Sequence, residues 1–225
     1  MKLSNETLTI LKNFANINSG IFFKQGKKLS TVSPSKTILA EVELTDEFPQ
    51  DFGIYDLNKF LSVVNMYKDN AELEFDPVNV TIGSGRAKTK YRLTDKTMIV
   101  APPDKQLTLP SEDVSFTLTA EDYDSVIKTA NILQSPNIAV ESDGDVVKLV
   151  MFDASNDAAD ISSIDLDVQP QGKRYKLVFK TENLKMIPGS YEVKISSKGI
   201  SNFKNEKANL QYWIATEAGV SKFEG

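Results

Sequence analysis

Four segments of the chain share one order of polar and apolar positions: a short apolar stretch that predicts a strand, a residue able to cap a helix, and an amphipathic stretch. Within each stretch the apolar residues recur three and four positions apart, which predicts a helix with one buried face. The capping residues carry a side-chain oxygen that can accept a backbone N–H. The segments are 1–17, 51–67, 114–134 and 175–189, and their predicted caps are Ser4, Asp56, Thr119 and Thr181.

Between the predicted helices, apolar and polar residues alternate along short runs. A period of two predicts strands of antiparallel sheets that bury one face. Turn residues separate these runs, as in Ser142-Asp143-Gly144-Asp145. The predicted strands are 38–44, 71–76, 78–83, 88–94, 137–142, 146–152, 162–168, 190–196 and 210–215.

The helix starts, near residues 5, 56, 120 and 181, divide the chain into approximate quarters. Such spacing indicates an internal repeat, although a single α+β domain with coincidental spacing is the alternative. Segment 101–106 interrupts the pattern with two prolines, which favours a linker. We therefore predict an α+β fold of two similar domains, each with two strand-helix-strand units and helices on one face of antiparallel sheets. The boundaries are 1–100 and 113–225 for the domains and 101–112 for the connector between them.

Composition narrows the chemistry that this chain can perform. It has no Cys and no His, which excludes disulfides, Cys-based metal sites and every Ser-His or Cys-His arrangement. Net charge is −5, so a basic protein that binds nucleic acid through its overall charge is excluded, whereas a local basic surface is not. Neither a signal peptide nor a membrane-spanning stretch is present, so we expect a soluble, cytoplasmic protein.

Acidic clusters offer the only support for an enzyme. Asp143 and Asp145 fit a turn, and Asp153, Asp157 and Asp160 lie in a loop without the spacing of a calcium-binding loop. The glycines of Gly83-Ser84-Gly85 lack the Gly-Lys-Ser/Thr ending of a phosphate-binding loop. We therefore expect neither catalysis nor a bound metal or cofactor.

Several stretches in both halves resemble the DNA sliding clamps of T-even-type bacteriophages, a family similar to proliferating cell nuclear antigen. The stretches are MKLSNETLTILKNFANINSGI, YDLNKFLSVV, IPGSYEVKI and QYWIA, at 1–21, 55–64, 187–195 and 211–215.

This resemblance implies a DNA-clamp fold and a homotrimeric ring that encircles duplex DNA, with helices lining the hole and sheets outside. Such a ring is a polymerase processivity factor without an active site of its own. An ATP-driven clamp loader opens and closes it, the replicative polymerase docks through a short peptide, and a role in late viral transcription is also implied. The expected place of action is the cytoplasm of the infected host cell.

Lysines on the polar faces of the predicted helices are the candidates to face DNA. A clamp must slide, so its contacts should engage phosphates and not base edges, and flexible lysines suit this need. The alternative for each is an ordinary solvated lysine. The candidates are Lys2, Lys12, Lys59, Lys68, Lys128 and Lys185.

Arg86, Lys88, Lys90 and Arg92 form the densest basic cluster, at alternate positions of one predicted strand. In a clamp this strand should lie in the outer sheet. A nucleic-acid patch is one interpretation, and a solvated face or a face that meets acidic groups of a neighbour is the other.

Apolar residues beside the connector are candidates to receive the anchors of a partner peptide. They could equally pack a domain junction. They are Pro102, Pro103, Leu107, Leu109, Pro110, Tyr212 and Ile214. An oligomeric β-rich virion protein remains the alternative function, although such a protein would not require the four matched helices with their lysines.

Overall fold

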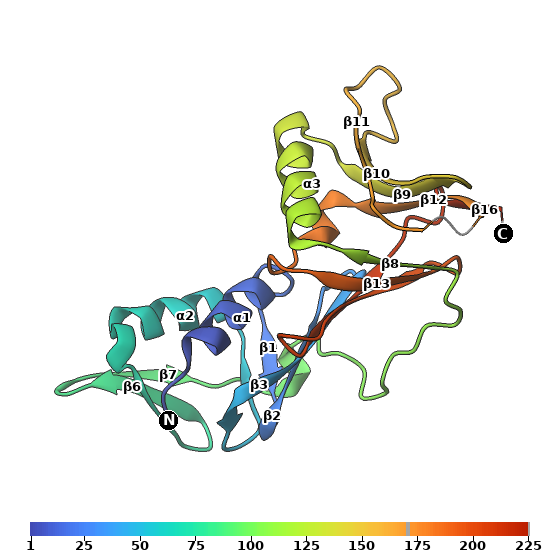
Figure 1. Ribbon diagram of the computed structural model, residues 1–225. Coiled ribbons are helices and arrows are strands. Elements are labelled where there is room, and N and C mark those ends of the chain that lie inside the picture. The colour runs from blue at the N-terminus through green and yellow to red at the C-terminus, as the bar shows by residue number, and fades with distance from the viewer. Residues whose placement is uncertain (170–171, 225) are drawn as a thin grey trace. The chain divides into compact units, whose positions relative to one another are not determined.

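The computed structural model describes residues 1–169 and 172–224 and divides into two compact units, Met1–Lys105 and Gln106–Gly225 (Figure 1). The division falls inside the predicted connector 101–112, which contains no helix or strand. Within the part of the chain that the structure describes, no helix combines the length and apolar character needed to cross a membrane.

In the N-terminal unit, two α-helices pack side by side. Each begins where the sequence predicts, because the side chain of Ser4 accepts the N–H of Thr7 and that of Asp56 accepts the N–H of Lys59. Both helices bury the apolar face that their spacing predicts. The helical elements are α1 (Asn5–Ala15), α2 (Leu57–Met66), η1 (Lys68–Asn70) and η2 (Lys96–Met98).

The strands of this unit pair antiparallel throughout. β1 pairs with β4, β2 pairs with β3, and β5, β6 and β7 form a three-stranded sheet in that order, with β7 as an outer strand. The strand predicted before α1 is absent: Met1 instead exchanges two backbone hydrogen bonds, both of 2.7 Å, with Leu73 on β5. The strands are β1 (Ile21–Phe23), β2 (Gly26–Val32), β3 (Ile38–Phe48), β4 (Phe52–Ile54), β5 (Glu72–Phe75), β6 (Asn79–Ser84) and β7 (Ala87–Arg92).

The C-terminal unit has one long helix, α3 (Ala120–Leu133), which begins at the predicted cap Thr119. α3 packs against β10 and β11 of a sheet ordered β11-β10-β9-β12-β16, so β11 is an outer strand. Strands β15, β14, β13 and β8 also pair in that order. The strands are β8 (Val114–Leu118), β9 (Asn137–Asp143), β10 (Val147–Phe152), β11 (Ser162–Asp165), β12 (Arg174–Lys180), β13 (Tyr191–Ser196), β14 (Ile200–Asn205), β15 (Leu210–Ala215) and β16 (Lys222–Glu224).

The predicted fourth helix is only a single 3₁₀ turn, η3 (Thr181–Leu184). Thr181 was wrongly predicted as its cap, because the Thr181 hydroxyl donates to the Ser135 carbonyl instead. Pro188 cannot continue a helix, and the buried side chains of Leu184 and Met186 hold the following residues in an irregular path.

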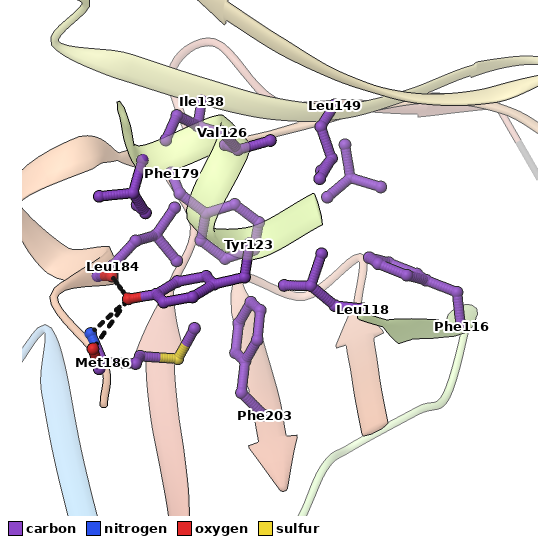
Figure 2. A pocket seen from close by; sticks show the side chains of 12 residues that line it. Phe116, Leu118, Tyr123, Val126, Ile138, Leu149, Phe179, Leu184, Met186 and Phe203 are labelled. Atoms are coloured by element: carbon purple, nitrogen blue, oxygen red, sulfur yellow. Dashed lines mark hydrogen bonds between the residues drawn. The ribbon is translucent and has the colours of Figure 1, made fainter. Parts of the chain in front are cut away.

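Tyrosine hydroxyls satisfy backbone groups of this segment that a helix would have paired internally. The Tyr123 hydroxyl donates to the carbonyls of Leu184 and Met186, at 2.8 and 2.9 Å, and accepts the Met186 N–H at 2.9 Å (Figure 2). Tyr191 donates to the Ile187 carbonyl, and Tyr212 accepts the Ile187 N–H. These buried hydroxyls therefore take the place of the missing helical hydrogen bonds. The three residues Tyr123, Tyr191 and Tyr212 are called the tyrosine cluster below.

Candidate functional site

The outward faces of α1 and α2 each carry one exposed lysine, Lys12 and Lys59. Both lie opposite the buried stripe of their helix, as predicted, and neither takes part in any ion pair found among residues 1–169 and 172–224. Because α1 and α2 pack side by side, we expect these two cations to lie on the same side of the N-terminal unit.

The other four candidate lysines are also exposed but differ in their surroundings. Lys2 lies 3.9 Å from a Glu72 carboxylate oxygen, and Lys128 lies 2.5 Å from a carboxylate oxygen of Asp124. Lys68 is in η1, and Lys185 follows η3 and not the longer helix that was predicted. Their contact with DNA stays a prediction, as it does for Lys12 and Lys59.

Three members of the basic cluster, Lys88, Lys90 and Arg92, lie on the exposed face of outer strand β7, and Arg86 lies in the turn just before it. The intervening residues point toward α2: Thr89 lies 2.7 Å from the Tyr67 hydroxyl, and the Tyr91 ring meets Phe60 edge to face. On the exposed face, Lys88 and Lys90 are each 3.9 Å from an acidic side chain of the same unit, Glu74 and Asp76 respectively. A hydrogen bond from the Val78 N–H lowers the pKa of Asp76, so this carboxylate is charged at neutral pH. Ion pairs this long and this exposed contribute little stability.

An acidic outer strand, which the sequence reasoning missed, is the counterpart of β7 in the C-terminal unit. Asp165, in β11, and Asp167, just beyond it, are exposed, whereas Leu166 between them is buried. Residues 149–172 contain no Lys or Arg, and residues 77–94 contain no Asp or Glu. These two blocks of single-sign charge were readable signals, but only the structure shows that each contains an outer strand of its sheet.

Two of the predicted partner-binding residues are placed wrongly. Tyr212 and Ile214 are both 0% exposed, so they cannot receive a peptide at the surface. The alternating pattern of residues 210–215 predicted a strand with one face open to solvent. Trp213, on the opposite face from Tyr212 and Ile214, is buried as well, so β15 is covered on both faces there. The remaining candidates are half-buried or exposed in the irregular connector and stay predictions: Pro102, Pro103, Leu107, Leu109 and Pro110.

Buried or shielded polar groups, also missed from the sequence, anchor the connector at each end. The side-chain amide of buried Asn18 donates to the carbonyls of Val32 and Val100, at 2.9 and 3.0 Å. At the other end, Asp113 accepts hydrogen bonds from the Ser111 hydroxyl and from Ser197, and the Ser111 bond is the largest cause lowering the pKa of Asp113. A lone Asn or Asp carries no sequence signal for such long-range contacts.

The acidic clusters considered for catalysis serve local turns. Asp143 accepts the N–H groups of Val146 and Asp145, and Asp153 accepts from Ser155; these bonds lower the pKa of both carboxyls, opposite to the shift that a general acid needs. Within the described ranges, no group of three or more acidic side chains is placed to hold a metal.

A small apolar cavity lies beneath α3, lined by Val126, Val140, Leu149 and neighbouring side chains (Figure 2). Its volume of ≈ 20 Å³ accommodates about one water molecule at most, and its lining offers that water no polar partner. The cavity is therefore a packing gap and not a ligand site.

Solved structures with this architecture define the class of protein. Proliferating cell nuclear antigen from Entamoeba histolytica superposes with a TM-score of 0.66 at 16% identity, covering 93% of this chain and 94% of that one. A. fulgidus PCNA, solved with the C-terminal region of FEN-1, gives 0.68 at 15% identity, with coverage of 93% and 94%. The Helicobacter pylori beta clamp bound to a DNA ligase peptide gives 0.70 at 14% identity, covering 96% of this chain and 64% of that one. The fold is the DNA-clamp fold.

Sequence relatives identify the family. The sliding clamp of Vibrio phage KVP40 is 33% identical over 97% of this chain and 100% of its own length, and that of Escherichia phage RB69 is 34% identical over 97% of each. The sliding clamp of Enterobacteria phage T4 is 31% identical, again over 97% of each chain. Residues 4–101 match the family of DNA polymerase processivity factors, and residues 115–218 match the C-terminal part of the gp45 sliding clamp. This chain belongs to the sliding clamp family of T4-like phages.

Proposed function

We propose that this chain assembles head to tail into a homotrimeric ring that encircles duplex DNA and tethers the replicative polymerase to it. The observation that carries the proposal is the opposite charge of the two outer strands, basic on β7 and acidic on β11. A ring needs two different, complementary surfaces on each subunit, joined by a rotation that closes.

The two outer strands are matched in more than charge. Beside β7 lies α2, and beside β11 lies α3, so pairing the strands extends both a sheet layer and a helix layer from one subunit to the next. The charges of β7 and of Asp165 and Asp167 all lie on the face away from the helices, where cross-strand partners meet.

The ring acts without catalysing a reaction and contacts DNA through lysines on its helices. Lys12 and Lys59 are exposed and unpaired within the described residues, which suits phosphate contact without base reading. Binding of this kind is weak and salt-dependent, so the ring stays on DNA because it is closed around it. We place this action in the cytoplasm of the phage-infected cell, whereas the late-transcription role remains a prediction.

Polymerase and an ATP-driven loader are the proposed partners, docking through short peptides. Clamps of this fold from A. fulgidus and H. pylori have been solved with the C-terminal region of FEN-1 and with a DNA ligase peptide, which supports the same mode here. The connector, anchored by Asn18 and by Asp113, offers Leu107 and Leu109 as half-buried apolar contacts.

The test is synthesis by the replication system's own polymerase and loader on a primed circular template, with excess DNA to trap released polymerase. A tether that raises effective concentration multiplies avidity by about 10²–10⁴, so we expect products at least ~10-fold longer per binding event. The matched control is the same template made linear with free duplex ends, from which a ring slides off. Equal products with and without this protein on the circle would refute the proposed function.

A further inference from the structure

The outward faces of the three α-helices differ in one electrostatic respect. Each face lies opposite the buried stripe of its helix and carries a single lysine. The exposed or outward residues are Asn5, Thr9, Lys12 and Asn16 for α1, Lys59, Ser62 and Met66 for α2, and Glu121, Asp124, Ser125, Lys128 and Ile132 for α3.

Among the outward residues given above for α1 and α2, Lys12 and Lys59 are the only charged side chains. The one acidic residue within α1, Glu6, accepts a hydrogen bond from Thr45 of β3 at 3.1 Å and is not among the outward residues of that helix. Asp56 precedes α2 and caps it by accepting the Lys59 N–H at 2.9 Å, so it lies outside the helix and is not among its outward residues. The formal charge of each outward face is therefore positive by one, at Lys12 and at Lys59.

On α3 the lysine is neutralised. The Nζ of Lys128 lies 2.5 Å from an oxygen of Asp124, four residues earlier, the spacing at which helical side chains meet. Glu121, one turn from Asp124, is exposed on the same side and adds a further negative charge. The outward face of α3 is therefore negative by one, and a phosphate approaching Lys128 must first displace Asp124.

We infer that the ring contacts the DNA backbone through Lys12 and Lys59 of the N-terminal unit, while α3 forms a weakly repelling surface that leaves DNA free. This inference rests on the proposed function, because it assumes that the helices face DNA in a trimer. Each subunit would then offer attractive helices in its N-terminal unit and a repelling helix in its C-terminal unit. Electrostatic attraction to phosphate decides this distribution, since these faces have no means of reading bases.

The experiment compares Lys12→Ala/Lys59→Ala with Lys128→Ala by the fluorescence anisotropy of a labelled 30-base-pair duplex over a series of salt concentrations. Each lost phosphate contact removes roughly 0.9 from the slope of log K against log salt, so the double variant should bind about 10-fold more weakly with a shallower slope. Lys128→Ala should bind within about twofold of the wild type. Asp124→Asn, which frees Lys128, should strengthen binding by about threefold.

The light-scattering mass of each variant confirms that assembly is intact before binding is compared. Lys128→Ala weakening binding as much as the double variant, or Asp124→Asn leaving it unchanged, would overturn the inference. If either binding result is obtained while the wild type still supports long products on circular templates, the inference about α3 is wrong and the proposed function stands. A wild type that fails on the circles defeats the proposed function, and the inference with it.

Discussion

Replacing Arg86 and Arg92 with glutamate should dissociate the ring into monomers. Arg92 lies on the exposed face of β7, and Arg86 is exposed in the turn just before β7. Neither forms an ion pair within the described part of its own chain, so their reversal breaks no ion pair inside the unit. Opposite charges paired across strands contribute about 0.2–1 kcal/mol each, and like charges cost a similar amount. Two reversed pairs should therefore weaken each interface by about 0.8–4 kcal/mol, or roughly 4-fold to several hundred-fold in Kd. Analytical ultracentrifugation at several protein concentrations measures this loss.

A compensating change makes the interface prediction specific to β11. Adding Asp165→Lys and Asp167→Lys to the same chain restores opposite charges and should restore the wild-type mass. The matched control is Lys198→Glu/Lys207→Glu, which changes net charge equally at exposed residues outside both strands, before β14 and before β15, and should leave assembly unchanged. Wild-type assembly by the Arg86/Arg92 variant, or failure of the compensated chain to reassemble, would contradict the β7–β11 pairing.

Removing one hydroxyl from the tyrosine cluster should destabilise the C-terminal unit. In Tyr123→Phe the ring still fills its place, but the Met186 carbonyl loses the buried hydroxyl that donates to it, whereas the Met186 N–H keeps its bond of 2.8 Å to the Leu184 carbonyl. A buried polar group left without a partner costs about 1–3 kcal/mol, so the free energy of unfolding should fall by that amount in urea titrations. Tyr55→Phe, at a ring that is 62% exposed, is the matched control and should change it by less than about 0.5 kcal/mol.

The same hydroxyl makes stability depend on alkaline pH. Burial raises the pKa of Tyr123 to about 12 from its ordinary value of 10.0, because the interior disfavours the tyrosinate. The unfolded chain therefore loses this proton first, and stability is full below pH 10 and declines as pH rises toward 12. The Tyr191 and Tyr212 hydroxyls, whose pKa values burial also raises, act in the same direction. Tyr123→Phe should show a shallower decline than the wild type over this interval, and an identical decline would contradict the assignment.

Local chemistry made most of the fold predictable. Ser4, Asp56 and Thr119 each precede an apolar pattern of helical period, and each caps the helix expected. The prediction of a fourth helix was wrong because tyrosine hydroxyls from α3, β13 and β15, far away in the chain, hydrogen-bond to this backbone and hold it in another path. Local patterns report propensity, whereas contacts between segments far apart in the chain decide such cases.

For the candidate site, too, local sequence patterns predicted some residues correctly, whereas others depend on contacts between distant segments. The exposure of Lys12 and Lys59 followed from helical period, and the Lys128–Asp124 pair was also readable, since its members are four residues apart. Tyr212 and Ile214 were misplaced because alternation reports which face a residue occupies and not whether another layer covers that face. The block without acidic residues, 77–94, and the block without basic residues, 149–172, can be seen in the sequence. The order of strands in the sheets was needed to show that each block contains an outer strand.

Ring formation by the unmodified chain is tested by its mass in solution, measured by light scattering at moderate salt over a range of protein concentrations. The chain has a mass of 25.0 kDa, so a closed trimer should give three times that value, about 75 kDa, with a decrease on dilution and at high salt. A mass that remains at 25.0 kDa at tens of micromolar protein would leave no ring to encircle DNA and would contradict the clamp mechanism proposed for this chain.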